Sequence, residues 1–203
     1  MKVPPVRFII DTEKDLWQSG YRNIAGMDEA GRGPLAGPVV SACVVFDPFV
    51  LIEGVFDSKS LLPSKRKDLY KIIVEKCRCF GIGIIDNITI DRVNILEATK
   101  LSMHEALQRL SIRPDYVLID AVRLQLDTPV KPIIKGDCKS FTIAAASIIA
   151  KVSRDSIMER LHEEYPMYGW DRNKGYGTEE HRKAIEKYGP SKYHRRSFKF
   201  KPA

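Results

Sequence analysis

The sequence predicts an α/β protein in which a mixed sheet of about five strands is flanked by helices. Two short apolar segments that read as strands come first, and further strand segments then alternate with helical ones. This order is typical of one mixed sheet with helices packed on it. A chain of 203 residues is long enough for one substantial core. We therefore expect a single domain at 1–203, with a core at about 20–165 and a small helical extension at about 166–203.

Five segments have the composition of strands. The first two, at 22–28 and 38–47, flank a glycine-rich turn, and the segment at 79–86 alternates glycine with isoleucine. The run at 115–120 is almost wholly apolar, as expected of a strand that is covered on both faces. A fifth strand is predicted at 131–135. Together these segments make up the predicted sheet.

The helices are predicted from apolar periodicity and from capping residues. The expected helices cover 6–19, 64–77 with Ser64 as the N-cap, 89 or 90 to 110, a segment that begins at Ser140, and about 178–188. Between the last two lies a loop at 165–177 that is rich in tyrosine, glycine and lysine. A basic tail follows, and we expect it either to be solvated or to contact a nucleic-acid backbone.

Composition limits the partners and the compartment. Lys and Arg number 33 against 26 Asp and Glu, which gives a net charge of +7 and favours a polyanionic partner. The four cysteines, Cys43, Cys77, Cys79 and Cys138, fit no zinc spacing, so we expect reduced thiols. No stretch has the roughly 18 apolar residues of a membrane span, and no signal peptide is recognisable. We expect a cytoplasmic protein without membrane association.

The most informative stretch is 26–38, Gly-Met-Asp-Glu-Ala-Gly-Arg-Gly-Pro-Leu-Ala-Gly-Pro. Its adjacent carboxylates, Asp28 and Glu29, repel each other unless a cation neutralises them. Carboxylate oxygens suit hard cations such as Mg²⁺ or Mn²⁺. Neighbouring side chains of a regular strand point to opposite faces, so both acids serve one site only if the pleat breaks at Glu29. The alternative is an acidic turn capped by glycines.

Two further acids follow predicted strands. Asp120 ends the buried strand, and Asp137 comes two residues after the fifth. Functional residues gather just beyond strand ends in open α/β sheets. Taken singly, each of these acids reads better as a loop cap. Taken with Asp28 and Glu29, they indicate a site where two divalent ions, about 3.5–4 Å apart, would clamp the attacking and leaving oxygens of a phosphodiester.

The stretch Asp-Glu-Ala-Gly-Arg-Gly-Pro-Leu-Ala-Gly-Pro-Val-Val resembles the first signature of ribonuclease HII of the bacterial type, and the resemblance runs from about 24 to 198. It implies a ribonuclease H-like fold. It also implies that the four acids Asp28, Glu29, Asp120 and Asp137 are catalytic metal ligands. Arg32 favours ribonuclease HII over the related ribonuclease HIII. Cys138 departs from the family, which usually carries Ser or Ala after the last acid.

The resemblance also implies the substrate contacts. The backbone of Gly31, Arg32 and Gly33 would read the 2′-hydroxyl, the group that distinguishes RNA from DNA. Tyr176 would pack beneath the sugar on the 3′ side of the ribonucleotide. Without the resemblance, Tyr176 reads as an ordinary buried tyrosine. The remaining candidates near the substrate are Lys59, Asn94, Ser147 and Lys151.

Some residues stay open at this point. Lys151 shares a helical face with Ser147 and Asp155, so it is either an ion-paired structural residue or a phosphate contact. Arg154 reads as structural. Three of the histidines, His104, His162 and His181, lie in helical segments and read as surface or packing residues.

The predicted function is a metal-dependent endonuclease. It would use Mn²⁺ or Mg²⁺, with two ions during catalysis. Its partners would be RNA/DNA hybrids and DNA duplexes that contain ribonucleotides, which it would cut 5′ to the ribonucleotide as a monomer. A non-catalytic nucleic-acid-binding module is one alternative, but a decayed site would have lost at least one acid. A junction resolvase is another, but it has no reason to keep the Gly-Arg-Gly turn or Tyr176.

Overall fold

The computed structural model describes residues 10–56 and 61–199, and its centre is a five-stranded sheet in the order β3-β2-β1-β4-β5. The strands are β1 (Ile24–Ala30), β2 (Val39–Val45), β3 (Cys79–Ile85), β4 (Tyr116–Asp120) and β5 (Val130–Ile133). β1 pairs antiparallel with β2 and parallel with β4, so the sheet is mixed, as predicted. β1 is therefore the middle strand, and the acid pair lies near the end of it.

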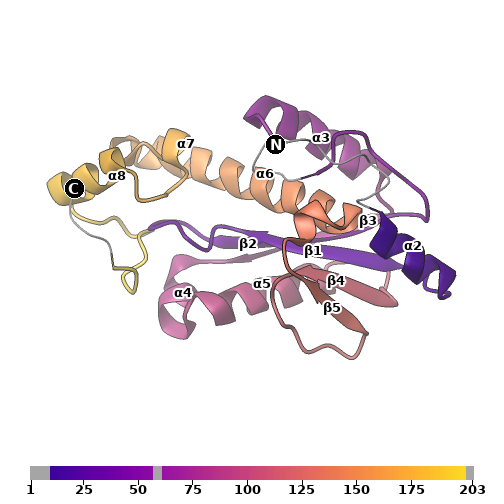
Figure 1. The fold of residues 1–203 in the computed structure, drawn as a ribbon. Coiled ribbons are helices and arrows are strands. Elements are labelled where there is room, and N and C mark those ends of the chain that lie inside the picture. Colours follow the sequence, from indigo (N-terminus) through magenta and orange to yellow (C-terminus); the bar gives the residue numbers. More distant parts are fainter. Residues whose placement is uncertain (1–9, 57–60, 200–203) are drawn as a thin grey trace.

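Helices cover both faces of the sheet (Figure 1). The long helix α6 (Phe141–Glu164) lies on one face, with α3 (Pro63–Lys76) packed on its outer side. On the other face lies α5 (Ile95–Gln108), preceded by α4 (Asn87–Val93). The short helix α2 (Asp11–Gln18) precedes β1. The prediction of a mixed sheet flanked by helices is confirmed.

Glycines allow α6 and α5 to lie directly on the strands. A Cβ at Gly26 in β1 would stand 2.1 Å from the carbonyl carbon of Thr142 in α6. A Cβ at Gly83 in β3 would stand 1.9 Å from the carbonyl oxygen of Ser102 in α5. Both positions therefore exclude any side chain. The contact at Gly26 places the first turns of α6 beside the acid pair of β1.

Two helix predictions differ from the structure. The helix expected from 89 or 90 to 110 is two helices, because Asn94 has a positive φ of 71° and caps α5 by accepting the N–H groups of Leu96 and Glu97. The predicted N-cap Ser64 is wrong, since α3 begins at Pro63, whose fixed φ suits a first helical position. Of the helix expected at 6–19, α2 covers 11–18, and residues 6–9 lie outside the described part.

The C-terminal region packs against the end of α6 that lies farthest from α2 (Figure 1). It contains η2 (Pro166–Tyr168), α7 (Trp170–Asn173) and α8 (Glu179–Tyr188), so the predicted helical C-terminal region is present. Part of the basic tail is not solvated, although a solvated tail was one of the two expectations. His194 and Arg195 are only 4% and 3% exposed, and His194 forms a β-bridge with Ala36. These two residues are buried because their polar groups bond to the chain itself, whereas Arg196, Ser197 and Lys199 are exposed.

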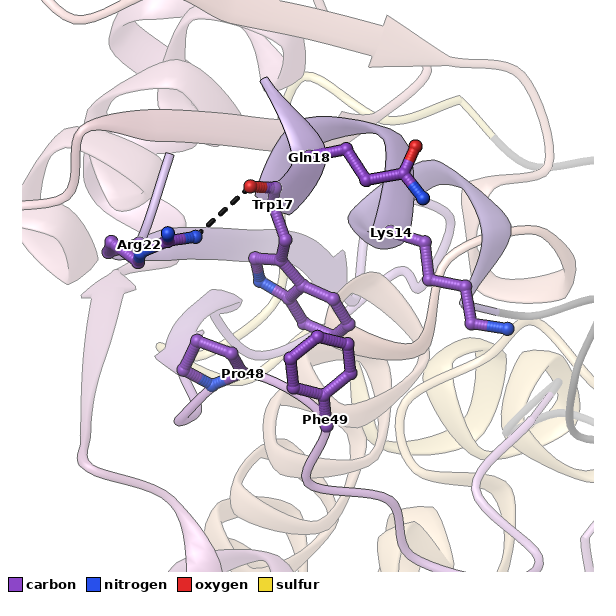
Figure 2. Close-up of a pocket in the computed structure, with 6 residues that line it drawn as sticks. All are labelled: Lys14, Trp17, Gln18, Arg22, Pro48 and Phe49. Atoms are coloured by element: carbon purple, nitrogen blue, oxygen red, sulfur yellow. Dashed lines mark hydrogen bonds between the residues drawn. The ribbon is translucent and has the colours of Figure 1, made fainter. Parts of the chain in front are cut away.

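A pocket of about 640 Å³ lies at the start of β1 (Figure 2). In it the rings of Trp17 and Phe49 lie 4.8 Å apart, and Phe49 holds a positive φ of 67°. Trp17 packs with Ile24, the first residue of β1, so this pocket is at the opposite end of the strand from the acid pair. The lining residues are Lys14, Trp17, Gln18, Arg22, Pro48 and Phe49.

Across the described ranges, no helix is both long enough and apolar enough to span a membrane.

Candidate active site

Four carboxylates gather where β1, β4 and β5 end, and we call this group (Asp28, Glu29, Asp120, Asp137) the acid edge. Met27 of β1 pairs with Ile119 of the parallel strand β4, so the next residue on each strand, Asp28 and Asp120, lies at the same edge of the sheet. Asp137 lies in η1 (Gly136–Cys138), which follows β5. The Gly136 N–H donates to the Asp120 carboxylate at 2.7 Å and so ties this turn to the end of β4.

The strand carrying the acid pair does not break at Glu29, contrary to the prediction. β1 continues to Ala30, with Glu29 opposite Ser41 and Ala30 opposite Val40 of β2. The pairing with β2 keeps the strand regular. Glu29 still lines the pocket beside the acid edge, and its carboxylate pairs with Arg32 at 3.3 Å. Asp28 and Glu29 both lie at the acid edge because they come after the last residue of β1 that pairs with β4, Met27.

Asp28 is the carboxylate most strongly affected by its surroundings. It is 4% exposed, and its pKa is raised well above the usual range, first by burial and then by the negative charges of Glu29 and Asp120. Hydrogen bonds from the Ser147 hydroxyl and from the Glu29 N–H, the latter at 2.7 Å, oppose this increase. The ionised acid edge is therefore electrostatically unfavourable unless a cation balances it.

The donor chemistry of the acid edge fits a hard divalent cation. Carboxylate oxygens are preferred by Mg²⁺ and Mn²⁺. In residues 10–56 and 61–199, no three His, Cys, Asp or Glu side chains are placed so that they could hold a metal ion by themselves. Mg²⁺ is commonly held by one or two carboxylates, with water and substrate phosphates completing its coordination. The acid edge fits an open site of that kind.

A pocket of about 210 Å³ adjoins the acid edge. It brings together six of the eight substrate contacts that the resemblance implied, and it does so from three separate segments: the end of β1 and its turn, α6, and the loop before α8. Its lining residues are Glu29, Ala30, Gly31, Arg32, Gly33, Ser147, Lys151 and Tyr176.

The turn at 31–33, here called the glycine turn, is held from behind by Arg195. This buried guanidinium donates to the carbonyl oxygens of Gly31 at 2.6 Å, Arg32 at 3.0 Å and Gly37 at 3.0 Å. In a trans peptide the N–H points opposite to the C=O. The N–H groups of Arg32 and Gly33 therefore point away from Arg195, and the turn presents them as hydrogen-bond donors.

A second buried arginine, Arg154, connects the segment at 36–38, just after the glycine turn, to the loop at 174–178, here called the tyrosine loop. It donates to the carbonyl oxygens of Pro38 and Ala36 on one side and of Lys174 on the other, at 2.9, 3.1 and 2.9 Å. Gly31 has a φ of 98°, and a Cβ there would stand 2.0 Å from Arg154 Nε, so only glycine fits. The structural interpretation of Arg154 is supported.

Tyr176 faces the glycine turn. The residue is 43% exposed, and a Cβ at Gly33 would stand 3.7 Å from ring atom Cε1, an ordinary contact distance. Tyr176 is therefore not the buried tyrosine that its residue type alone suggested. The ring and the outward N–H groups of the glycine turn border the same pocket.

The other predicted contacts differ in their placement. Lys151 donates to Asp155 at 2.6 Å and also lines the pocket with Ser147, so the ion pair does not remove it from the site. Asn94 uses its side chain to cap α5, and its contact with substrate stays a prediction. Lys59 lies outside the described residues.

Sequence reasoning missed the contribution of three buried cationic or aromatic side chains. Arg195 and His194 belong to a tail that looked solvated, and His181 looked like a surface or packing residue. All three are at most 4% exposed and hydrogen-bonded. Only the match of the tail to a family signature hinted at a role, because an arginine that bonds to distant carbonyls has no local pattern.

A family model, curated relatives and a solved structure all relate this chain to the same family of proteins. The family model described as Ribonuclease HII matches residues 25–201. The chain is 53% identical over 186 residues to Ribonuclease HII of Bacillus licheniformis, covering 92% of this chain and 73% of that protein. It is 52% identical to Ribonuclease HII of Syntrophus aciditrophicus, with coverage of 93% and 90%. The crystal structure of ribonuclease H2 from Pyrococcus horikoshii superimposes with a TM-score of 0.74 at 29% identity, covering 87% and 93% of the two chains.

Proposed function

The chain belongs to the ribonuclease HII family and is a ribonuclease H, a hydrolytic endonuclease, and we propose that it cuts the phosphodiester 5′ to a ribonucleotide embedded in duplex DNA. The same site would cut the RNA strand of RNA/DNA hybrids. Both reactions leave 3′-hydroxyl and 5′-phosphate ends. The enzyme would act as a monomer.

One observation carries this proposal: the acid edge, where burial and the charges of Glu29 and Asp120 raise the pKa of Asp28, borders the same pocket as a backbone turn with outward N–H groups and an exposed tyrosine ring. The N–H groups of Arg32 and Gly33 suit the oxygen of a 2′-hydroxyl. A deoxyribose has no oxygen there, so the turn would leave its donors without an acceptor. The ring of Tyr176 offers an apolar face against which a sugar can pack.

The chain's own residues fit the chemistry of phosphodiester hydrolysis. Divalent ions bound at Asp28, Glu29, Asp120 and Asp137 would supply charge neutralisation for the attacking water and the departing 3′-oxygen. Hydrogen bonds from the Ser147 hydroxyl and the Glu29 N–H hold the Asp28 carboxylate in a fixed orientation.

The Gly136 N–H does the same for Asp120. Lys151, beside the pocket, adds positive charge near the phosphate. The glycine turn and Tyr176 select which phosphodiester reaches the acids.

The test is cleavage of a labelled DNA duplex that carries one ribonucleotide, run with Mg²⁺, with Mn²⁺ and with EDTA, beside the same duplex without the ribonucleotide. We expect metal-dependent cutting on the 5′ side of the ribonucleotide only. Binding without cutting under every condition would establish the non-catalytic alternative. Cutting of the all-DNA duplex would refute the proposed 2′-hydroxyl selection while leaving the nuclease chemistry in place.

Two variants refine the assay. Tyr176→Ala should slow cleavage and weaken the preference for the ribonucleotide junction, because the sugar loses the ring it packs on. Asp120→Asn should abolish cleavage and leave duplex binding largely intact. An unchanged junction preference in Tyr176→Ala would make this tyrosine a packing residue, and activity in Asp120→Asn would remove Asp120 from the proposed metal site.

A further inference from the structure

Two buried histidines from different segments meet behind the tyrosine loop. His181 lies in the first turn of α8 and is fully buried, and His194 belongs to the C-terminal tail. Their Nε2 atoms are 3.1 Å apart, and their rings contact Tyr168 and Trp170. Neither histidine borders the pocket at the acid edge, and the proposed reaction uses neither.

The hydrogen bonds of His194 fix its tautomer. The backbone N–H of Ser191 donates to His194 Nδ1 at 2.9 Å. An N–H can only donate, so Nδ1 is the acceptor and carries no proton. The proton of the neutral ring is therefore on Nε2, which donates to Nε2 of His181.

The tautomer of His181 follows from that of His194. Its Nε2 accepts from the His194 ring and also from the indole N–H of Trp170 at 3.0 Å. With two donors aimed at Nε2, the proton of His181 must be on Nδ1. Nδ1 lies 2.9 Å from the carbonyl oxygen of Tyr176 and donates to it.

This last bond acts on the residue that faces the glycine turn. The Tyr176 carbonyl also accepts the N–H of Thr178 at 2.8 Å, and the Tyr176 N–H donates to the Asn173 carbonyl at 2.9 Å. The peptide groups on both sides of Tyr176 are thus held. Tyr176 as a whole is 43% exposed, and Cζ of its charged neighbour Arg154 is 5.9 Å from the ring centroid. The direction of the ring consequently depends on the backbone more than on side-chain packing.

We propose that His181 is a positioning residue for the reaction: fixed in one tautomer by Trp170 and His194, it holds the Tyr176 backbone so that the ring meets the substrate sugar beside the glycine turn. This inference rests on the proposed contact of Tyr176 with the substrate and adds the residue that orients it. The histidine pair does not touch substrate or metal ligands.

A purely structural role is the competing explanation. In that case the histidines fill the aromatic cluster, and substitutions lower stability without a specific effect on cleavage. The two explanations separate in the kinetics. A positioning role through Tyr176 predicts that a change at His181 matters only while the Tyr176 ring is present, whereas a packing role predicts an effect that is independent of the ring.

The variants use the shapes of the amide side chains. In His181→Asn the amide N–H₂ takes the place of Nδ1 and still donates to the Tyr176 carbonyl. In His181→Gln the amide reaches the position of Nε2, and the donor to Tyr176 is lost. Cleavage of the single-ribonucleotide duplex is measured in Mg²⁺ for both variants, in the parent and in the Tyr176→Ala background, with thermal unfolding measured in parallel.

We expect His181→Gln to lower kcat/KM about threefold to tenfold, the effect of one lost hydrogen bond, and His181→Asn to retain most of the activity. In the Tyr176→Ala background, His181→Gln should change cleavage no further. Equal effects in both backgrounds, or equal loss in the Asn and Gln variants, would overturn the proposal.

The experiment also distinguishes a failure of the proposed contact between Tyr176 and the substrate sugar. If Tyr176→Ala alone leaves cleavage unchanged, the proposed sugar contact is wrong, and His181 has nothing to position. If His181→Gln does not fold, His194→Asn replaces it, because its amide keeps an acceptor for the Ser191 N–H and removes the donor to His181. We then expect a smaller loss of cleavage in the same direction, and full activity would overturn the proposal.

Discussion

Buried polar groups occur in two neighbouring parts of this protein. Their interactions are repulsive in one part and attractive in the other. At the acid edge, Asp28 is surrounded by charges of its own kind, and burial and repulsion raise its pKa. Behind the glycine turn, Arg195 and Arg154 each make three hydrogen bonds to backbone carbonyls. In the first group like charges repel one another, and in the second the donors are matched to acceptors.

This difference distinguishes the carboxylates proposed to take part in the reaction from the arginines that fix the backbone around them. A carboxylate set that repels itself destabilises the folded protein and becomes favourable only when a cation and a phosphate arrive. A buried arginine that bonds to carbonyls from two segments fixes the distance between those segments. Arg195 bonds to the glycine turn and Arg154 to the segment at 36–38 that follows it, and so they give the acid edge a rigid neighbour. Four changes test this contrast.

The largest expected effect is that of Asp28→Asn. Removing the central carboxylate should lower cleavage by about 10³-fold or more, because the charge that binds the cations is lost. The same change should raise the free energy of unfolding by about 1 kcal/mol at neutral pH, because a repulsive buried charge disappears. Cleavage rates and urea unfolding of the variant measure both.

Asp127→Asn is the matched control for Asp28→Asn, since Asp127 is an exposed aspartate in the loop between β4 and β5. It should change neither cleavage nor stability. A loss of stability in Asp28→Asn would show that the carboxylates of the acid edge do not repel one another. The proposed contrast between the acid edge and the buried arginines would then be wrong.

Two glycines of the turn should respond differently. In Gly31→Ala the new methyl group meets Arg154 Nε at 2.0 Å in a backbone with a φ of 98°, so we expect a loss of about 3 kcal/mol in the free energy of unfolding. In Gly33→Ala the methyl group stands 3.7 Å from the Tyr176 ring, and stability should change by less than about 0.5 kcal/mol. Chemical denaturation of both variants gives the comparison, and equal losses would contradict the bracing by Arg154.

Divalent metal should stabilise the protein in a pH-dependent way. Because the folded-state pKa of Asp28 is raised, its contribution to stability is fully present below the unfolded-state pKa of 3.8 and is lost as the pH rises through the folded pKa. Mg²⁺ at about 100 times its dissociation constant should add about 2.7 kcal/mol where the acids are ionised.

The measurement is thermal unfolding with and without Mg²⁺ at pH 8 and pH 5. The stabilisation should be larger at pH 8. Asp28→Asn serves as the control and should lose most of it. An equal effect of Mg²⁺ in the parent and in this variant would place the metal elsewhere.

The smallest expected effect belongs to the histidine pair. Burial, followed by the charges of His181 and Arg196, lowers the pKa of His194 to about 4, and burial also lowers that of His181 against the opposing charge of Glu180. A lowered histidine pKa stabilises the fold above the unfolded value near 6.5, and that stability is lost as the pH falls toward 4. The full shift corresponds to about 3 kcal/mol, and because nearby solvent screens the charge we expect a loss of about 1 kcal/mol over this window.

His194→Asn should flatten this part of the stability profile, which urea unfolding at a series of pH values would detect. Because the acid edge gains stability as the pH falls and the histidine pair loses it, the two regions predict opposite slopes. A profile that is unchanged in His194→Asn would remove the pair as a source of acid sensitivity.

Sequence alone supported much of the fold and the identity of the site. Periodicity and strand order predicted the mixed sheet, and the acids at the ends of predicted strands indicated where chemistry would occur. These signals are local, since a strand alternates and a cap recurs within a few residues. The same reasoning was wrong at Glu29, where pairing with β2 keeps the strand regular, and it missed the break between two helices at Asn94.

What the sequence determined was therefore the five strands of a mixed sheet, the longer helices and the acids that follow the strands. The tertiary structure decided which distant groups meet: Arg195 with carbonyls more than 150 residues away, and His181 with His194 behind Tyr176. The physical reason is that local backbone preferences act over a few residues, whereas a buried donor finds its acceptor only after the chain has closed around it. The reactive groups can be read from the sequence, but the side chains that position them become visible only in the folded protein.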